Sequence, residues 1–255
     1  MGYFKSKENA IKVIRYVKGA YKEEHDNFHS FRMESFGITE NIDGLSRLKR
    51  LLLMYVQARP ILLSKKNVLK IFIQFEDKFK DFDFKESLKS GAEDTIRNME
   101  KKLDDLPYIG PKIANLVLNH FFCFTDTMNR FGIEQPKILR CLKLPVDVHV
   151  RRLLCYRLQL VFKEEYKNLE TNSPGFQKEL KDLLQNESEL FPIDLDILWY
   201  IGYSNCNLRI FCKECKIRGK CEDRFFENET RNKVADPKRA EEEICFVKKH
   251  GDNVY

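Results

Sequence analysis

The chain has 255 residues, a mass of 30.3 kDa and a formal net charge of +6, so it is long enough to bury one large core or two smaller ones without disulfides. Hydrophobic residues make up 43% of the sequence and charged residues 33%, which argues against both a disordered chain and a membrane protein. No apolar run approaches the roughly 20 residues of a membrane-spanning helix, and the excess of basic residues favours a polyanionic partner.

Apolar residues recur at helical spacing along most of the chain, which predicts an all-α fold. Residues 123–141 are polar and irregular and predict a connecting loop. Residues 226–255 form a charged extension with one short helical pattern at 241–247. Pro60 should end the second helix of the chain. The expected helices cover residues 8–24, 45–57, 67–75, 85–88, 93–103, 111–122, 147–161, 173–185 and 194–201.

The eight cysteines fall into two groups. One group lies among apolar neighbours, as expected for small core residues in a reducing compartment. The other crowds into 16 residues with the spacing Cys-x5-Cys-x2-Cys-x5-Cys, which in an intracellular chain indicates a metal site rather than disulfides. Four thiolates suit either tetrahedral zinc or an iron–sulfur cluster, and spacing alone does not choose between them. The core group is Cys123, Cys141, Cys155 and Cys245, and the clustered group is Cys206, Cys212, Cys215 and Cys221.

A tight turn is expected between the helices 93–103 and 111–122. Pro107 and Gly110 are typical turn residues, and Pro111 suits the first position of the second helix. The start of a helix exposes unpaired N–H groups and a partial positive charge. Ile109 and Gly110 are therefore candidates to bind a DNA phosphate without regard to base sequence. A plain corner between two core helices is the alternative interpretation.

The stretch from Leu106 to Asn115 resembles the helix-hairpin-helix of the DNA glycosylase superfamily that contains endonuclease III and the 8-oxoguanine glycosylases. Tyr108 stands where the family usually has the first hairpin glycine, and at positive φ a tyrosine there would cost on the order of 1 kcal/mol. The resemblance places Lys112 at the family's catalytic lysine. An amine that attacks a sugar carbon must be neutral, and the first turn of a helix disfavours the ammonium form.

The resemblance also covers Pro145-Val146-Asp147-Val148-His149, which precedes an apolar helix and is especially similar to the 8-oxoguanine branch. It implies that Asp147 is the essential carboxylate, besides acting as an N-cap. A carboxylate there would stabilise the oxocarbenium-like sugar and help to deprotonate the attacking amine. His149 is expected to be structural. Lys112 and Asp147 are 35 positions apart, more than in endonuclease III relatives, and we infer an inserted loop within residues 123–141.

The clustered cysteines are similar to the endonuclease III pattern Cys-x6-Cys-x2-Cys-x5-Cys, with one residue fewer in the first gap. With Tyr200-Ile201-Gly202-Tyr203 upstream, the resemblance implies a structural [4Fe-4S] cluster, because four cysteines leave no open metal position. Gln57 matches a glutamine that in such enzymes enters the space left by a flipped base. The cysteine segment is strongly basic, as expected of a phosphate clamp. Its candidate DNA contacts are Arg209, Lys213, Lys216 and Arg218.

These motifs together predict a two-lobed helical glycosylase fold. One domain would cover residues 42–146 and end in the hairpin, and an iron–sulfur domain would combine residues 1–41 with 147–225. We expect a bifunctional DNA glycosylase and abasic-site lyase that removes oxidised pyrimidines from double-stranded DNA through a Schiff base at Lys112 and β-elimination. It would act as a monomer away from membranes, near the nucleoid of a prokaryote or in a eukaryotic nucleus. The alternatives are an 8-oxoguanine glycosylase/lyase and a non-catalytic, zinc-containing DNA-binding module.

Overall fold

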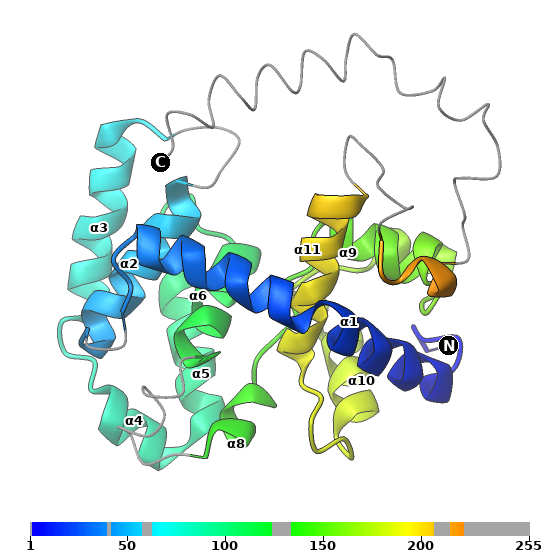
Figure 1. Ribbon diagram of the computed structural model, residues 1–255. Helices are drawn as coiled ribbons and strands as arrows, with labels where there is room; N and C mark the ends of the chain where they lie inside the picture. The colour runs from blue at the N-terminus through cyan, green and yellow to red at the C-terminus, as the bar shows by residue number, and fades with distance from the viewer. Residues whose placement is uncertain (1, 40–41, 58–62, 124–133, 207–214, 222–255) are drawn as a thin grey trace, which may run out of the picture. The chain divides into compact units, whose positions relative to one another are not determined.

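The computed structural model describes residues 2–39, 42–57, 63–123, 134–206 and 215–221 (Figure 1). The regular elements in these ranges are helices, and Phe4 and Val161 form an isolated antiparallel bridge. The prediction of an all-α fold is therefore confirmed. Among the helices of these ranges, none has the length and apolar character needed to cross a bilayer.

The chain divides into two compact units. The hairpin unit consists of Asp26–Asp147 and Leu169–Asp196, and the cysteine unit consists of Met1–His25, Val148–Asn168 and Ile197–Tyr255. Helix α1 (Lys7–Ser35) therefore contributes its first part to the cysteine unit and its last part to the hairpin unit. This division differs from the expected one, because residues 26–41 and 169–196 belong with the hairpin.

In the hairpin unit, α6 lies against α2, α5 and α8 (Figure 1). Its buried side is apolar, and Phe121 and Phe122 are fully enclosed. Aromatic rings fill much of this core, with the Phe84 and Phe121 centroids 5.4 Å apart. The helices are α2 (Gly44–Gln57), α3 (Lys65–Phe79), α4 (Phe84–Ser90), α5 (Ala92–Asp104), α6 (Pro111–Cys123), α8 (Gln135–Leu139) and α10 (Pro174–Leu184), and a 3-10 turn, η3, covers Pro192–Leu195.

Short polar side chains set where several of these helices begin. Ser64 Oγ accepts the Asn67 N–H at 3.3 Å at the start of α3, and Asp83 Oδ1 accepts the Glu86 N–H at 3.0 Å at the start of α4. Each of these bonds satisfies an N–H group that has no acceptor within the helix. Such caps fix the ends of the helices that surround α6.

In the cysteine unit, Gly202 lies where a larger residue would not fit. A Cβ atom at this position would lie 2.5 Å from the His149 Cβ, so glycine lets two helices approach closely. This packing places His149 of α9 against α11. The helical elements of the unit are α9 (Val148–Arg152), the π-helical turn η1 (Leu153–Arg157), the 3-10 turns η2 (Lys163–Lys167) and η4 (Arg218–Lys220), and α11 (Asp196–Asn205), whose first residue belongs to the hairpin unit.

Three element predictions need correction. The helix expected over 8–24 continues to Ser35, because no proline or glycine interrupts residues 25–35 and His29 is buried. The helix expected over 147–161 begins at Val148 and its last turn widens into a π-helix that ends at Arg157. The stretch 123–141, expected to be a loop, contains α8, because Pro136 suits the first turn of a helix and Ile138 is fully buried. Residues 124–133 and the pattern at 241–247 lie outside the described residues.

The expected core cysteines have different environments. Cys155 is fully buried, and burial raises the pKa of its thiol to about 12, so it is an inert core residue. Cys141 is half-buried. Cys123 is exposed, so the core prediction is wrong for this residue, which ends α6. Cys245 lies outside the described residues.

The Gln177 amide ties α10 to the backbone of the hairpin unit and provides a test of the fold. Gln177→Leu should lower the free energy of unfolding by about 2 kcal/mol, because both backbone groups of Leu144 lose a buried partner. The measurement is urea denaturation followed by circular dichroism. Lys178→Leu is the control, since Lys178 is exposed and should change stability by less than about 0.5 kcal/mol. Equal effects of the two substitutions would contradict the role of the amide.

Candidate active site

The turn between α5 and α6 is tight and closed by backbone hydrogen bonds. The Leu106 N–H donates to Leu103 O at 3.0 Å, and the Ile109 N–H donates to Leu106 O at 3.1 Å. Leu106 and Ile109 are both buried. The Gly110 carbonyl accepts hydrogen bonds from the N–H groups of Ile113 and Ala114, so α6 begins directly after this glycine. The predicted turn between two helices is therefore present.

Tyr108 adopts a φ of 65° in this turn. This left-handed conformation favours glycine and costs other residues about 1 kcal/mol or more. Gly110 is different, because it does not have a positive φ and no heavy atom lies within 4 Å of its potential Cβ. Neither backbone angle nor packing requires glycine at position 110. Glycine would therefore be favoured at position 108, where this chain has tyrosine, and is not required at position 110.

Lys112 and Asp147 meet in the hairpin unit. The Lys112 Nζ lies 3.2 Å from the Asp147 Oδ2. Lys112 lies in the first turn of α6, and Asp147 immediately precedes α9. The lysine side chain is 43% exposed, whereas the aspartate side chain is only 10% exposed. The structure thus brings together the two residues that the sequence marked as catalytic candidates.

Buried side chains hold the segment that leads to Asp147. They bind the backbone of residues 143–146, which pairs with no strand in the described part of the chain, so the amides and hydroxyl supply the hydrogen bonds instead. Two of them, Gln177 and Thr171, come from the stretch 169–184, which explains why it belongs to the hairpin unit. The bonds run from Asn119 Nδ2 to Lys143 O (3.0 Å), from Leu144 N to Gln177 Oε1 (3.1 Å), from Gln177 Nε2 to Leu144 O (2.9 Å) and from Val146 N to Thr171 Oγ1 (2.8 Å).

A second set of polar contacts braces the first turns of α6. Glu100 of α5 accepts hydrogen bonds from Lys143 Nζ at 2.6 Å and from Asn115 Nδ2 at 3.0 Å. Asn115 also donates to Pro111 O at 2.8 Å. Since positions i, i+3 and i+7 share one face of a helix, Lys112 lies on the same face as Asn115 and Asn119. One face of α6 therefore carries both the lysine and the amides that fix its surroundings.

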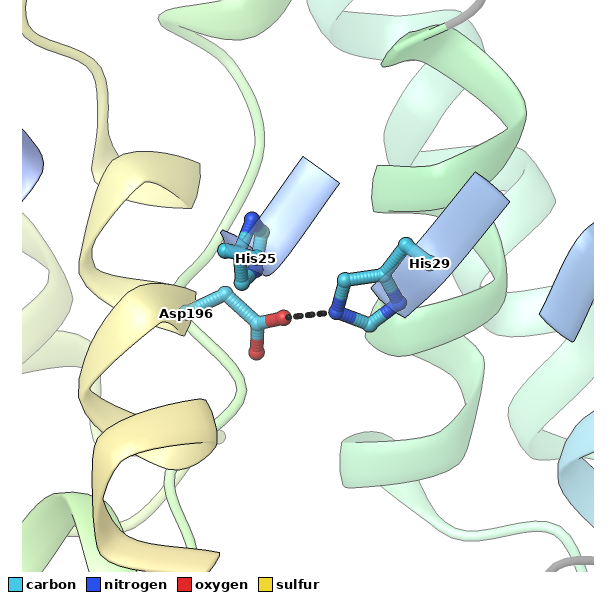
Figure 2. Close-up of side chains that lie close together, drawn as sticks. All are labelled: His25, His29 and Asp196. Carbon is cyan, nitrogen blue, oxygen red and sulfur yellow. Dashed lines mark ion pairs between the residues drawn. The ribbon is translucent and has the colours of Figure 1, made fainter. Parts of the chain in front are cut away.

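A chain of buried polar side chains connects α1, α2 and α6 within the hairpin unit. Tyr55 Oη lies 2.7 Å from His120 Nδ1, and His120 Nε2 lies 2.8 Å from His29 Nδ1. Figure 2 shows the next link, the ion pair between His29 and Asp196 at 3.5 Å. His25 precedes His29 by one turn of α1. Burial raises the pKa of Tyr55 well above its usual range, so its phenol stays neutral and hydrogen-bonded.

The polar chain that links Tyr55, His120, His29 and Asp196 was not expected from the sequence. Its members lie on different elements, far apart along the chain, and no local motif connects them. It fastens α2, which ends at the exposed Gln57, to α6. The structure thus places Gln57 at the end of a firmly held helix, as the sequence suggested, although residues 58–62 lie outside the described part.

One of the described clustered cysteines contacts a buried tyrosine of α1. Cys215 is buried, Cys206 and Cys221 are half-buried, and all three are thiols. The Tyr21 hydroxyl donates to Cys215 Sγ at 3.4 Å. Burial, and after it this hydrogen bond, raise the pKa of Tyr21, so its phenol keeps its proton. The sulfurs of these three cysteines do not all lie within 4.8 Å of one another, so they do not form the close set that a single metal ion needs. Thiolates as a class suit soft metals and iron–sulfur clusters, and Cys212, the fourth expected ligand, lies outside the described residues.

The expected phosphate contacts have mixed outcomes. Lys216 forms an ion pair with Glu24, and its ammonium lies 5.6 Å from the ring centre of Tyr21, so its charge is already paired. Arg218 is exposed. The Ile109 N–H is bonded within the turn, which leaves the Gly110 N–H for an incoming phosphate. Arg209 and Lys213 lie outside the described residues.

Comparison of the chain with protein-family models, with curated proteins and with solved structures found no match. The geometry of the hairpin unit and the thiols of the cysteine unit are therefore the basis on which a function can be argued.

The strain at Tyr108 can be measured by comparing two substitutions that both remove the ring. Tyr108→Gly should be more stable than Tyr108→Ala by about 1 kcal/mol, because only glycine adopts a φ of 65° without steric cost. Chemical denaturation of both variants gives this difference directly. Alanine as stable as glycine at position 108 would contradict a left-handed conformation in the folded protein.

Proposed function

We propose that the chain is a bifunctional DNA glycosylase and abasic-site lyase of the helix-hairpin-helix type, with oxidised pyrimidines in double-stranded DNA as its substrate class. The observation that carries the proposal is the 3.2 Å contact between Lys112 Nζ and Asp147 Oδ2. An amine and a carboxylate at hydrogen-bond distance can exchange a proton directly. That exchange is what converts an ammonium group into a nucleophile.

Each step of the reaction balances with these two residues. Asp147 accepts a proton from Lys112, and the amine attacks C1′ of an everted nucleotide while the bond from C1′ to the base breaks and the base leaves with the electron pair. The carboxylate stabilises the positive sugar in this transition state. The attached nitrogen then gives one proton to the departing base anion, and Asp147 returns its proton to the ring oxygen as the C1′–O bond breaks and the sugar opens to an iminium ion. The Asp147 carboxylate, again unprotonated, accepts a C2′ proton, and the 3′ phosphate leaves with the electron pair of the C3′–O bond, which cuts the strand.

The hairpin supports DNA binding next to this pair. The start of α6 presents backbone N–H groups and the positive end of a helix dipole. Gly110 has no side chain in the way, and nothing else occupies the space of its potential Cβ among the described residues. A phosphate could therefore reach the backbone two residues before Lys112. Contacts of this kind position DNA without reading its sequence.

The clustered cysteines support a [4Fe-4S] cluster as the structural cofactor. Cys206, Cys215 and Cys221 with Cys212 would hold it, and it would supply rigidity to the segment rather than an open catalytic position. For the substrate, the sequence Pro145-Val146-Asp147-Val148-His149 favours 8-oxoguanine as the alternative base. Cleavage assays on DNA that contains single modified bases distinguish the two substrates.

Borohydride trapping tests the proposed covalent intermediate. Borohydride delivers a hydride to the iminium carbon, so the full chain incubated with lesion-bearing DNA should become covalently attached to it. Lys112→Gln should abolish the product, because the nucleophilic nitrogen is gone. The measurement is the protein–DNA adduct on a denaturing gel. Undiminished trapping by this variant would end the proposal.

Two matched variants control this experiment. Lys49 of α2 pairs with Glu76 of α3 in the same unit and has no part in the contacts that brace α6, so Lys49→Gln removes a comparably exposed ion pair and should leave trapping intact. Asp147→Asn keeps the size of the side chain but not its charge, and should slow trapping on base-bearing DNA by about 10²- to 10⁴-fold. Glu76→Gln is its control, because it removes the carboxylate of the Lys49–Glu76 pair, and should have no comparable effect.

The cofactor can be identified independently of activity. The chain purified without oxygen should be brown and contain about four iron atoms per molecule, because four thiolates suit this cluster. Absorbance spectra and metal analysis provide the measurement. Stoichiometric zinc in a colourless protein would instead support the non-catalytic DNA-binding module, especially if trapping also failed.

A further inference from the structure

The phenol of Tyr21 lies at the centre of the cysteine unit. Its side chain is buried, and its hydroxyl lies 3.4 Å from Cys215 Sγ. The ring packs edge-on against Tyr200 with centroids 6.3 Å apart. Helix α1 thus brings a polar group into an otherwise enclosed place, directly against one of the four clustered cysteines. Such a group needs a defined set of hydrogen-bond partners.

The partners of the Tyr21 oxygen decide where its proton points. The oxygen accepts the backbone N–H of Lys216 at 2.9 Å and the side-chain amide of Asn205 at 3.4 Å. A phenol has one proton to donate and a limited capacity to accept. With two N–H donors already directed at the oxygen, the hydroxyl proton is left for the sulfur of Cys215. The surrounding residues therefore orient Tyr21 as a hydrogen-bond donor to this sulfur.

We propose that Tyr21 is a positioning residue of the metal centre, acting as the hydrogen-bond donor to the metal-bound thiolate of Cys215. The inference rests on the metal centre of the proposed function but not on its glycosylase chemistry. A hydrogen bond to a thiolate stabilises its negative charge and orients the ligand. Partners of this kind typically change metal affinity by about 10- to 100-fold, and hydrogen bonds to the sulfurs help to set the reduction potential of a cluster.

Tyr16 provides a matched comparison on the same helix. Its hydroxyl also reaches the cysteine segment, but it donates to the backbone oxygen of Lys216 at 2.9 Å. Both tyrosines therefore tether the same residue of this segment to α1. Only Tyr21 bonds a sulfur. Removing each hydroxyl in turn therefore distinguishes the loss of a tether to the cysteine segment from the loss of a hydrogen bond to a cysteine sulfur.

The test compares Tyr21→Phe and Tyr16→Phe in the full chain. Metal release to an excess of chelator should be about tenfold faster in Tyr21→Phe, and the reduction potential of an iron–sulfur centre should become more negative, since the thiolate loses its donor. Tyr16→Phe should release metal within about twofold of the unchanged chain and keep its potential. Circular dichroism verifies that both variants keep their helical content.

The possible results separate this inference from the proposed cofactor. A brown protein in which both variants behave like the unchanged chain would overturn the role of Tyr21 and leave the cluster intact. Equal acceleration in both variants would also overturn it, because tethering would then explain the loss. A zinc protein in which only Tyr21→Phe releases metal faster would support Tyr21 and refute the cluster. A chain that binds no metal would refute both.

Discussion

The candidate active site depends on how the extended segment before Asp147 is held. Residues 143–146 pair with no strand among the residues that the structure describes, and a buried backbone that lacks partners costs about 1–3 kcal/mol for each group. Asn119, Gln177 and Thr171 supply those partners. Asn119 is buried in α6, Gln177 in α10 and Thr171 in the turn before α10, so packed side chains hold the segment in place. That position brings Asp147 to Lys112.

The ion pair itself cannot create this arrangement. Lys112 is 43% exposed, and a pair with such an exposed partner contributes only about 0–1 kcal/mol. The surrounding hydrogen bonds of Asn115, Glu100 and Asn119 are more numerous and lie in less exposed places. These surrounding hydrogen bonds therefore set the distance between Lys112 and Asp147, and the weak ion pair forms as a consequence. A lysine held this loosely remains able to leave its partner for a substrate.

The sequence predicted those features that depend on nearby residues. Apolar spacing located α2, α5 and α6 to within a few residues, and Pro107, Gly110 and Pro111 located the turn. It could not predict the chain of Tyr55, His120, His29 and Asp196 or the donor role of Tyr21. These contacts join residues separated by up to 194 positions, and no periodicity records them. Gln177 illustrates the difficulty, since a buried glutamine has the same local pattern as an exposed one.

The approach of Lys112 to Asp147 was expected through resemblance to a family and not from spacing, because a separation of 35 positions allows many folds. From the sequence we could say only that a tyrosine at position 108 would be strained if its φ were positive. The φ of 65° meets that condition. Strain of this kind persists only where the surroundings over-determine the backbone, and here the buried Leu106 and Ile109 fix the turn on both sides. The strained residue lies four positions before Lys112, so the part of the hairpin unit that stores backbone strain is also the part that carries the proposed nucleophile.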